Sequence, residues 1–263
     1  MTALPALPLQ QSPQFARALT AFGSDVVSTA PVVLQRRIGT WGGIRFASRI
    51  RSDALTQAPR LINGEDDAPA AYRAAGYRQI MTPAHVAEWD LTQTDRRAAM
   101  QGKWRNRLVK GEAAGLRVRQ TYWDGRPHWL FHQAAAQARA RRYRDYPFAL
   151  LAAYAAINPK DALMFEATAK GHPVAACLVM SHGLTATYMT AHCTPLGRDL
   201  QAPRVLLDHA AGHLTNSGHQ LFDLGLVETD HAPGLARFKL GTGARLRALG
   251  GTWIRLGRRR DTG

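Results

Sequence analysis

The sequence has few cysteines and no long apolar run. Two cysteines, Cys177 and Cys193, are too few for a disulfide framework or for paired CxxC zinc motifs. No apolar stretch approaches the roughly 18–20 residues of a membrane helix, so we expect no integral membrane segment. The first cation is Arg17, and prolines at 5, 8 and 13 interrupt any apolar signal core, so we expect a cytoplasmic protein.

Acidic residues are also scarce, with 19 Asp+Glu against 34 Lys+Arg in 263 residues, a net charge of +15. Such a charge attracts polyanions, including RNA, phosphorylated lipids and acidic carrier proteins. It is equally the charge of a solvated basic surface in a chain rich in arginine and alanine, so charge alone names no partner. A hydrophobic content of 46% is enough to bury a core, which excludes a disordered basic tail.

Hydrophobic periodicity, caps and turn residues predict the elements. We expect helices at 9–22, 70–75, 94–114, 127–143, 148–157, 201–217 and 233–240. We expect strands at 32–38, 44–48, 77–82, 85–91, 116–123, 163–169, 174–181, 185–192, 220–224 and 253–256. From residue 116 the order is strand, two helices, three strands, helix, strand, helix, strand. This order predicts an α+β layer fold rather than a doubly wound sheet.

That element order is the plan of the GCN5-related N-acetyltransferase (GNAT) superfamily. Three stretches resemble the Fem-type peptidyltransferases and their GNAT-like relatives: LQQSPQFARAL at 9–19, KWRNRLVKGEAAGL at 103–116 and FDLGLVETDHAPGLARFKLGTGA at 222–244. The resemblance spans about 9–256. It implies a GNAT-like mixed, mostly antiparallel sheet flanked by helices, in two halves. We place a degenerate half at 1–115, the catalytic half at 116–257, and a basic disordered tail at 258–263.

The resemblance implies an N-acyltransferase that moves an acyl or aminoacyl group from an activated donor to an amine acceptor. The donor is a co-substrate (acyl-CoA, an acyl carrier protein or aminoacyl-tRNA), and no tightly bound cofactor or metal is expected. The best-known members use aminoacyl-tRNA and carry a helical arm, which this chain lacks. Two alternatives stay open: a CoA-dependent N-acetyltransferase, and a non-catalytic module that binds RNA or anionic membrane. The oligomeric state is not predicted.

Lys239 is the leading catalytic candidate. Amide formation passes through a tetrahedral oxyanion, which the site must stabilise with donors or a cation. The Fem-type resemblance places Phe238 and Lys239 at the Phe-Lys pair that lines the acceptor site, with Arg237 beside it as a substrate-binding residue. Lysine occurs only five times among 34 cations, which favours a role for a point charge. The alternative is an ordinary surface lysine on a helix.

Candidates for the general base come from two places, and a further histidine is assigned to substrate binding. His231, with Asp230 to orient it, has a pKa suited to accepting an amine proton, although a loop histidine is often only solvated. Glu166, in the middle of a predicted strand, is a further base candidate. His192 ends the strand at which GNAT enzymes separate their sheet, and we assign it to substrate binding; a strand-end histidine with a hydrogen bond is the alternative.

Asp223 and Gly225 end the predicted strand at 220–224, where the resemblance implies that they shape the substrate cleft. The alternative is that both residues are structural: Asp223 caps the following loop, and Gly225 provides an unusual backbone angle.

Gly197 and Arg198 are the predicted donor-binding residues. GNAT enzymes hold the CoA pyrophosphate on a Gln/Arg-x-x-Gly-x-Gly/Ala loop, whose N–H groups face the phosphates. Aligned from Arg198, Gln201 replaces the inner glycine and Pro203 the last small residue, and proline removes an N–H donor. This departure favours a polyanionic carrier, an acyl carrier protein or a tRNA, over CoA.

Two basic clusters are candidate contacts for such a carrier. One is the predicted helix with Lys103, Arg105, Arg107 and Lys110 around Trp104, for which an inward Trp104 and solvated charges are the alternative. The other is Arg139, Arg141, Arg142 and Arg144, interleaved with Tyr143 and Tyr146.

Overall fold

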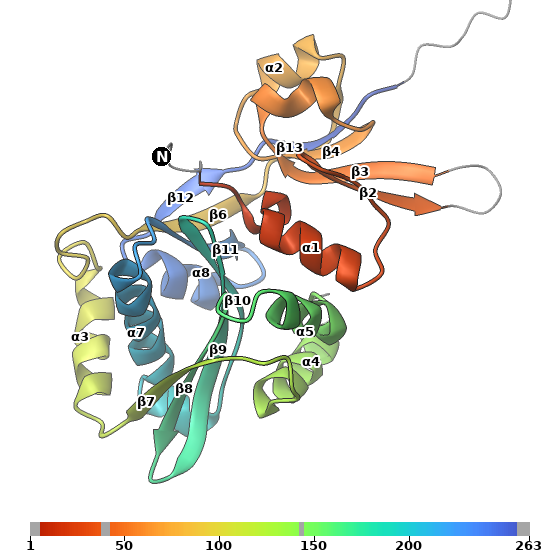
Figure 1. The fold of residues 1–263 in the computed structure, drawn as a ribbon. Coiled ribbons are helices and arrows are strands. Elements are labelled where there is room, and N and C mark those ends of the chain that lie inside the picture. Colours follow the sequence, from red (N-terminus) through yellow and green to blue (C-terminus); the bar gives the residue numbers. More distant parts are fainter. Residues whose placement is uncertain (1–5, 38–42, 142–144, 257–263) are drawn as a thin grey trace, which may run out of the picture.

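The computed structural model describes residues 6–37, 43–141 and 145–256, which form two mostly antiparallel sheets flanked by helices (Figure 1). Sheet A has the order β1 (Val26–Thr29), β2 (Val32–Arg37), β3 (Gly43–Ile50), β4 (Leu61–Gly64), β13 (Gly251–Ile254), β5 (Arg78–Met81). Sheet B has the order β12 (Arg245–Ala248), β6 (His85–Asp90), β11 (Leu221–Val227), β10 (Thr185–Cys193), β9 (His172–His182), β8 (Ala162–Ala169), β7 (Arg117–Tyr122). The predicted α+β class is confirmed.

Helices cover both faces of sheet B (Figure 1). The α-helices are α1 (Pro13–Ala21), α2 (Pro69–Ala74), α3 (Gly102–Glu112), α4 (Trp129–Arg141), α5 (Phe148–Ile157), α6 (Pro195–Asp199), α7 (Ala202–Asn216) and α8 (Pro233–Leu240). Two 3₁₀ helices are η1 (Leu9–Gln11) and η2 (Ser52–Gln57). Within the described residues, no helix combines the length and the hydropathy needed to cross a membrane.

Each face of sheet B has its own core. Alternation along the strands sends Phe165 and Phe222 toward α3 and α7, and Met164 and Leu178 toward α1, α4 and α5. A third, smaller core packs α2 and η2 against sheet A around Trp253, which is completely buried. The second core joins the N-terminal helix to sheet B, so α1 lies between the two sheets (Figure 1).

Strands β10 and β11 separate after three residue pairs. They run parallel from Thr185↔Leu221 to Thr187↔Asp223, and no pairing is seen beyond that point in the described strands. The register of β11 against β6 also shifts between Asp223 and Leu226, where Gly225 has a φ of +78°. A positive φ favours glycine, and the bulge turns β11 away from β10. The separation opens the sheet next to α8.

Each sheet is built mainly from one of the ranges 1–115 and 116–257, and each contains one strand from the other range. β6 belongs to the range 1–115 and lies in sheet B, whereas β13 comes near the C-terminus and lies in sheet A between β4 and β5. The ranges 1–115 and 116–257 are therefore interlocked through these two strands. The descent of the first half from a GNAT domain stays a prediction.

The long predicted elements are present, and the main error concerns the helix expected at 94–114. Only α3 (Gly102–Glu112) forms, because the carboxylate of Asp95 accepts the N–H groups of Arg97 (3.0 Å) and Ala98 (3.1 Å) and closes a turn instead. The short elements β1, β4, β12, η2 and α6 were not predicted, because they offer too few positions for a periodic pattern. The predicted tail at 258–263 lies outside the described residues.

Candidate functional site

A cavity of about 590 Å³ lies beside the C-terminal half of β10, where that strand has left β11. Its basic lining residues are Arg107 from α3, Arg198 from α6 and Arg204 from α7. No carboxylate is among the described residues that line it. The rest of the wall is formed by Gln137, Ala175, Ala176, Tyr188, Ala191, His192, Cys193, Gln201, Pro203, Leu206, Gly234, Leu235 and Phe238.

Arg204 shows that the positive charge of this cavity is not compensated. Burial lowers its pKa, and the nearby Arg107 lowers it further. Its Nη1 donates to Gln201 Oε1 (2.7 Å), and its guanidinium lies 5.8 Å from the ring centroid of Trp104 and 5.7 Å from that of Phe238. Two neighbouring cations without an acid are stabilised by a bound anion. We therefore call this space the anion cavity.

The backbone where α6 meets α7 has few N–H groups left to offer a phosphate. Gly197 N donates to Thr194 Oγ1 (3.1 Å). Further along, main-chain carbonyls accept the N–H groups of Arg198, Leu200, Gln201, Arg204 and Val205. Gln201 has a φ of +58°, and its side chain donates back to Arg198 O (3.0 Å). An anion in this cavity therefore meets mainly arginine side chains.

Gly197 is buried and does not line the cavity. A β-carbon at this position would lie 2.3 Å from Val174 O, so close packing against β9 is enough to require glycine. Its predicted donor contact stays a prediction.

Lys239 lies on the face of α8 that is turned toward β11. It is 7% exposed, and its Nζ donates to Leu226 O (2.7 Å). Burial lowers the pKa of Lys239 to about 8, against the opposing influence of the negative charge of Asp223. Its neighbour Phe238 lines the anion cavity, so the two residues of the Phe-Lys pair face two sides of one helix.

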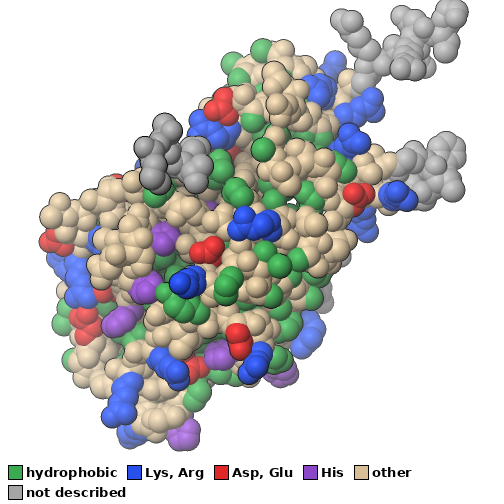
Figure 2. Space-filling model, in the orientation of Figure 1, with side chains coloured by type: hydrophobic (Ala, Val, Ile, Leu, Met, Phe, Trp, Pro, Cys, Tyr) green, Lys and Arg blue, Asp and Glu red, His purple; other side chains and the backbone are tan. Residues whose placement is uncertain are grey.

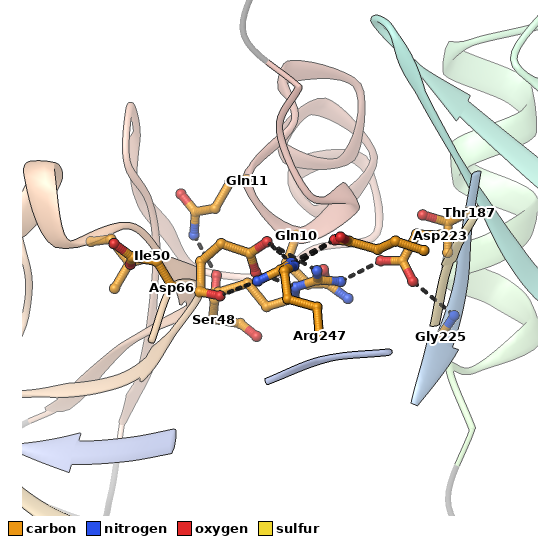
Figure 3. A network of polar contacts seen from close by, with 12 residues as sticks. Gln10, Gln11, Ser48, Ile50, Asp66, Thr187, Asp223, Gly225 and Arg247 are labelled. Atoms are coloured by element: carbon orange, nitrogen blue, oxygen red, sulfur yellow. Dashed lines mark hydrogen bonds and ion pairs between the residues drawn. The ribbon is translucent and has the colours of Figure 1, made fainter. Parts of the chain in front are cut away.

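Asp223 and Gly225 stand on the other side of Lys239. Asp223 is 2% exposed; its Oδ1 accepts Gly225 N–H (2.7 Å) and its Oδ2 accepts Arg49 Nη1 (2.5 Å). Figure 3 shows Asp223 directed toward Gly225 at one end of a charged network. A β-carbon on Gly225 would lie 3.6 Å from Lys239 Nζ, so this bulge packs next to the amine.

Residues of this network line a second cavity of about 260 Å³ between the two sheets. Besides Asp223, its wall includes Arg49 and Glu65 from sheet A and its flank, and Arg247 from β12. Asp223 thus borders the inter-sheet cavity, whereas Phe238 borders the anion cavity. Lys239 itself lines neither cavity and contacts β11 through its bond to Leu226 O.

The family model of the acetyltransferase (GNAT) domain matches residues 89–243, more than half of the chain. The protein belongs to this family. No curated protein matches it in sequence.

Solved structures show how widely this fold is shared. A structure of FemX has 11% identity and a TM-score of 0.73, covering 95% of this chain and 94% of that chain. The C-terminal domain of a putative lysylphosphatidylglycerol synthetase from Agrobacterium fabrum has 13% identity and a TM-score of 0.62, covering 95% and 89%. The L-PGS of Bacillus licheniformis has 12% identity and a TM-score of 0.56, covering 95% and 93%. Identities this low show a common fold alone.

In this GNAT protein His192 and Glu166 lie on one face of sheet B. The β-pairing aligns Glu166, Ala176 and His192 in one row across β8, β9 and β10. Trp129 of α4 covers the row: its Nε1 donates to Glu166 Oε2 (2.5 Å), and its ring meets His192 edge to face at 5.9 Å. His128 Nε2 lies 3.1 Å from the same Glu166 oxygen. His192 lines the anion cavity; Glu166 does not.

His192 is the better placed of these groups to exchange a proton with a ligand. The residue lines the anion cavity, although its Nδ1 is shielded from solvent and has no partner in the described structure. Burial lowers the pKa of His192, and the charge of Arg198 lowers it further, which favours the neutral imidazole. Glu166 instead accepts from the Trp129 indole N–H, which holds that ring against His192.

The remaining predicted residues are exposed. Asp230 and His231 lie in the loop before α8, where Asp230 accepts from the Thr229 hydroxyl (3.3 Å), and Arg237 points outward from α8. None of the three lines either cavity. Their predicted roles stay predictions.

Arg107 was predicted only as part of a basic helix, and Arg204 and Arg49 were not predicted. Trp104 is 4% exposed, so it packs inward, and Arg107 lies on the outer face of α3 with Lys103 and Lys110. In the second cluster Arg142, Tyr143 and Arg144 lie outside the described residues, and Tyr146 accepts a hydrogen bond from Gln10 (3.0 Å). Figure 2 shows Lys and Arg side chains spread over the visible face rather than gathered in one patch.

Proposed function

We propose that this GNAT protein transfers an acyl or aminoacyl group from a phosphate-bearing carrier to an amine. Membership of the family supports acyl transfer in general. The observation that carries the finer proposal is the anion cavity: Arg107, Arg198 and Arg204 line it without a carboxylate, at the point where β10 leaves β11. Such a wall suits the phosphates of a donor better than a neutral substrate.

Lys239 supplies the oxyanion contact in this proposal. When an amine attacks the acyl carbonyl, negative charge develops on the carbonyl oxygen. An ammonium group has three donors, and Leu226 O engages one of those on Lys239. Two N–H donors therefore remain for the oxyanion, and their low-dielectric surroundings strengthen that contact.

His192 accepts the proton that the amine loses. It lines the anion cavity, and its Nδ1 has no partner in the described structure. The lowered pKa of His192 keeps the imidazole neutral and able to accept a proton near neutral pH. Trp129, held by Glu166, fixes the orientation of the ring. In this scheme Glu166 is a positioning residue.

The donor we favour is a polyanionic carrier, aminoacyl-tRNA or an acyl carrier protein, rather than CoA. The N–H groups that would surround a CoA pyrophosphate at the start of α7 are largely bonded within the α6–α7 segment. Arginine side chains remain, and they bind phosphates at varied positions. Arg107, which lines the cavity, is exposed on α3 together with Lys103 and Lys110.

A donor panel tests the proposal. The purified protein is incubated with labelled acetyl-CoA, acyl carrier protein and aminoacyl-tRNA, together with the amine-containing small molecules of a cell extract. Formation of a labelled amide from either polyanionic carrier, reduced at least tenfold in Arg204→Ala, is the expected result. No amide from any donor, combined with salt-sensitive RNA binding, contradicts it and favours a non-catalytic module.

A CoA-dependent N-acetyltransferase is the second candidate. The family model describes an acetyltransferase domain, and Arg198 and Arg204 flank the start of α7, where GNAT enzymes bind the pyrophosphate. A thermal shift with acetyl-CoA, and labelled amide from acetyl-CoA alone, would favour this candidate over the first.

A further inference from the structure

Arg49 has a backbone conformation that is rare for its residue type. It has a φ of +53°, in the left-handed region that disfavours side chains with a β-carbon. It lies where the register of β3 against β4 shifts between Ala47 and Ile50. Such a bulge interrupts the alternation of the strand and redirects one side chain. Here the redirected side chain crosses from sheet A to sheet B.

The guanidinium of Arg49 joins two carboxylates from different parts of the chain. Its Nε and Nη2 donate to Glu65 (2.6 and 3.1 Å), and its Nη1 donates to Asp223 Oδ2 (2.5 Å). The side chains of Arg49 and Asp223 are 11% and 3% exposed, so water screens this pair weakly. Glu65 is also paired with Arg247 (2.6 Å), which holds Glu88 (2.7 Å).

Both oxygens of Asp223 are therefore occupied, one by Arg49 and the other by Gly225 N–H. Lys239 is close enough to feel the charge of Asp223. Yet among the described residues no ion pair joins Lys239 to a carboxylate, and its Nζ donates to Leu226 O instead.

We propose that Arg49 is a positioning residue for the transfer site: by holding Asp223 in the inter-sheet ion pair, it prevents Asp223 from pairing with Lys239 and leaves the Lys239 ammonium free for the oxyanion. This inference rests on the role of Lys239 in the proposed function. In this proposal, the ion pair between the two sheets influences the reacting atoms through Asp223 and Lys239. Loss of Arg49 lets Asp223 turn toward Lys239, whose ammonium lies within the influence of the Asp223 charge.

The other charged groups around this pair do not replace Arg49. His182 from β9 feels the charge of Asp223, but burial lowers the pKa of His182 to about 4, so it is neutral. Glu65, Arg247 and Glu88 are paired with one another, and Arg245 pairs with Glu88 at 3.3 Å. Arg49 is thus the cation that holds Asp223.

The test follows the titration of Lys239 directly. The chain has five lysines, so a protein labelled with ¹³C at the lysine ε-carbons has few NMR signals, and Lys239→Met assigns the one of interest. In the wild type we expect a titration midpoint near pH 8. Arg49→Gln is expected to raise that midpoint by at least one pH unit, because an ion pair with Asp223 stabilises the ammonium.

The double variant Arg49→Gln/Asp223→Asn tests whether the effect of Arg49 on the Lys239 midpoint passes through Asp223. If Arg49 acts through Asp223, the midpoint returns to the wild-type value or below it. A midpoint that stays raised in the double variant, or an unchanged midpoint in Arg49→Gln, overturns the inference. Asp223→Asn alone keeps Arg49 and is expected to lower the midpoint, so the test survives if Arg49→Gln does not fold.

Arg51→Gln is the matched control. Arg51 also lines the inter-sheet cavity, but it pairs with the exposed Asp53 (3.0 Å), and its loss should leave the Lys239 midpoint in place. In transfer assays Arg49→Gln should lower kcat, and the double variant should recover part of it. The NMR result needs no substrate: if Lys239→Met retains full transfer activity, the proposed function fails even where the titration behaves as expected.

Discussion

At the scale of single residues, the proposed function sets opposite requirements for the charges of Lys239 and His192. Lys239 must be protonated to stabilise an oxyanion, and burial lowers its pKa to about 8. His192 must be neutral to accept a proton, and burial lowers its pKa from the usual value near 6.5. Both groups are therefore in the required state around neutral pH, although burial lowers the pKa of both.

These two shifts predict a bell-shaped pH dependence of kcat/KM. The rate should rise as His192 loses its proton below about pH 6.5, and fall as Lys239 loses its proton through about pH 8. Lys239→Arg keeps a cation at all these pH values, so the alkaline limb should disappear. A rate that continues to rise through pH 9 in the wild-type protein would contradict the role of the Lys239 ammonium.

At the scale of elements, much of the order of helices and strands along the chain was predictable, because long elements carry their period in the sequence. Helices α5 and α8 have the predicted bounds, and α1 lies within the helix predicted at 9–22, where Ser12 Oγ caps it by accepting Phe15 N–H (3.2 Å). Four-residue strands such as β4 and β12 lack such a signal, since their positions depend on partners far along the chain.

The site was predictable only where one motif carries it. Phe238 and Lys239 lie on one short helix, so a local resemblance was enough to propose them. Arg107 reaches Arg204 only because α3 packs against α7, with Gly111 close to Val205. Arg49 and Asp223 are 174 residues apart, and no local pattern announces their contact.

Packing of α3 on α7 leads to a prediction about donor affinity. Arg204→Ala should weaken binding of the donor about 10–100-fold, because a hydrogen bond to a charged phosphate contributes roughly 1.5–3 kcal/mol. Arg107→Ala should act in the same direction. Fluorescence anisotropy with a labelled donor gives the dissociation constants. Arg105→Ala is the control, because Arg105 is exposed on α3 outside the cavity; equal losses in Arg105→Ala and Arg204→Ala would point to general charge attraction only.

At the scale of the whole molecule, the two sheets are joined by exchanged strands and by the ion pairs of Arg49 and Arg247. β13 brings Trp253 into the core of sheet A, where its indole N–H donates to Gly250 O (2.6 Å) and its ring stacks on Tyr72 at 5.1 Å. The last described strand thus completes a sheet that otherwise consists of N-terminal strands. Folding of the two sheets should be coupled.

Trp253→Ala tests that coupling. Loss of a fully buried indole should reduce the free energy of unfolding by about 3–5 kcal/mol. Denaturant titrations followed by circular dichroism and by fluorescence should still coincide in one transition. Leu256→Ala, at an exposed position after β13, should change stability by less than about 0.5 kcal/mol. Two separate transitions in the wild type would show that the sheets fold independently.

The central claim, that this GNAT protein transfers an acyl group with Lys239 at the oxyanion, is tested most directly by single-turnover transfer with Lys239→Met. Methionine fills a similar volume without the charge. With the donor that the panel identifies, the account predicts that the transfer rate falls about 10²–10³-fold, while the donor dissociation constant changes by less than about threefold. A Lys239→Met protein that transfers the acyl group within threefold of the wild-type rate would contradict the account.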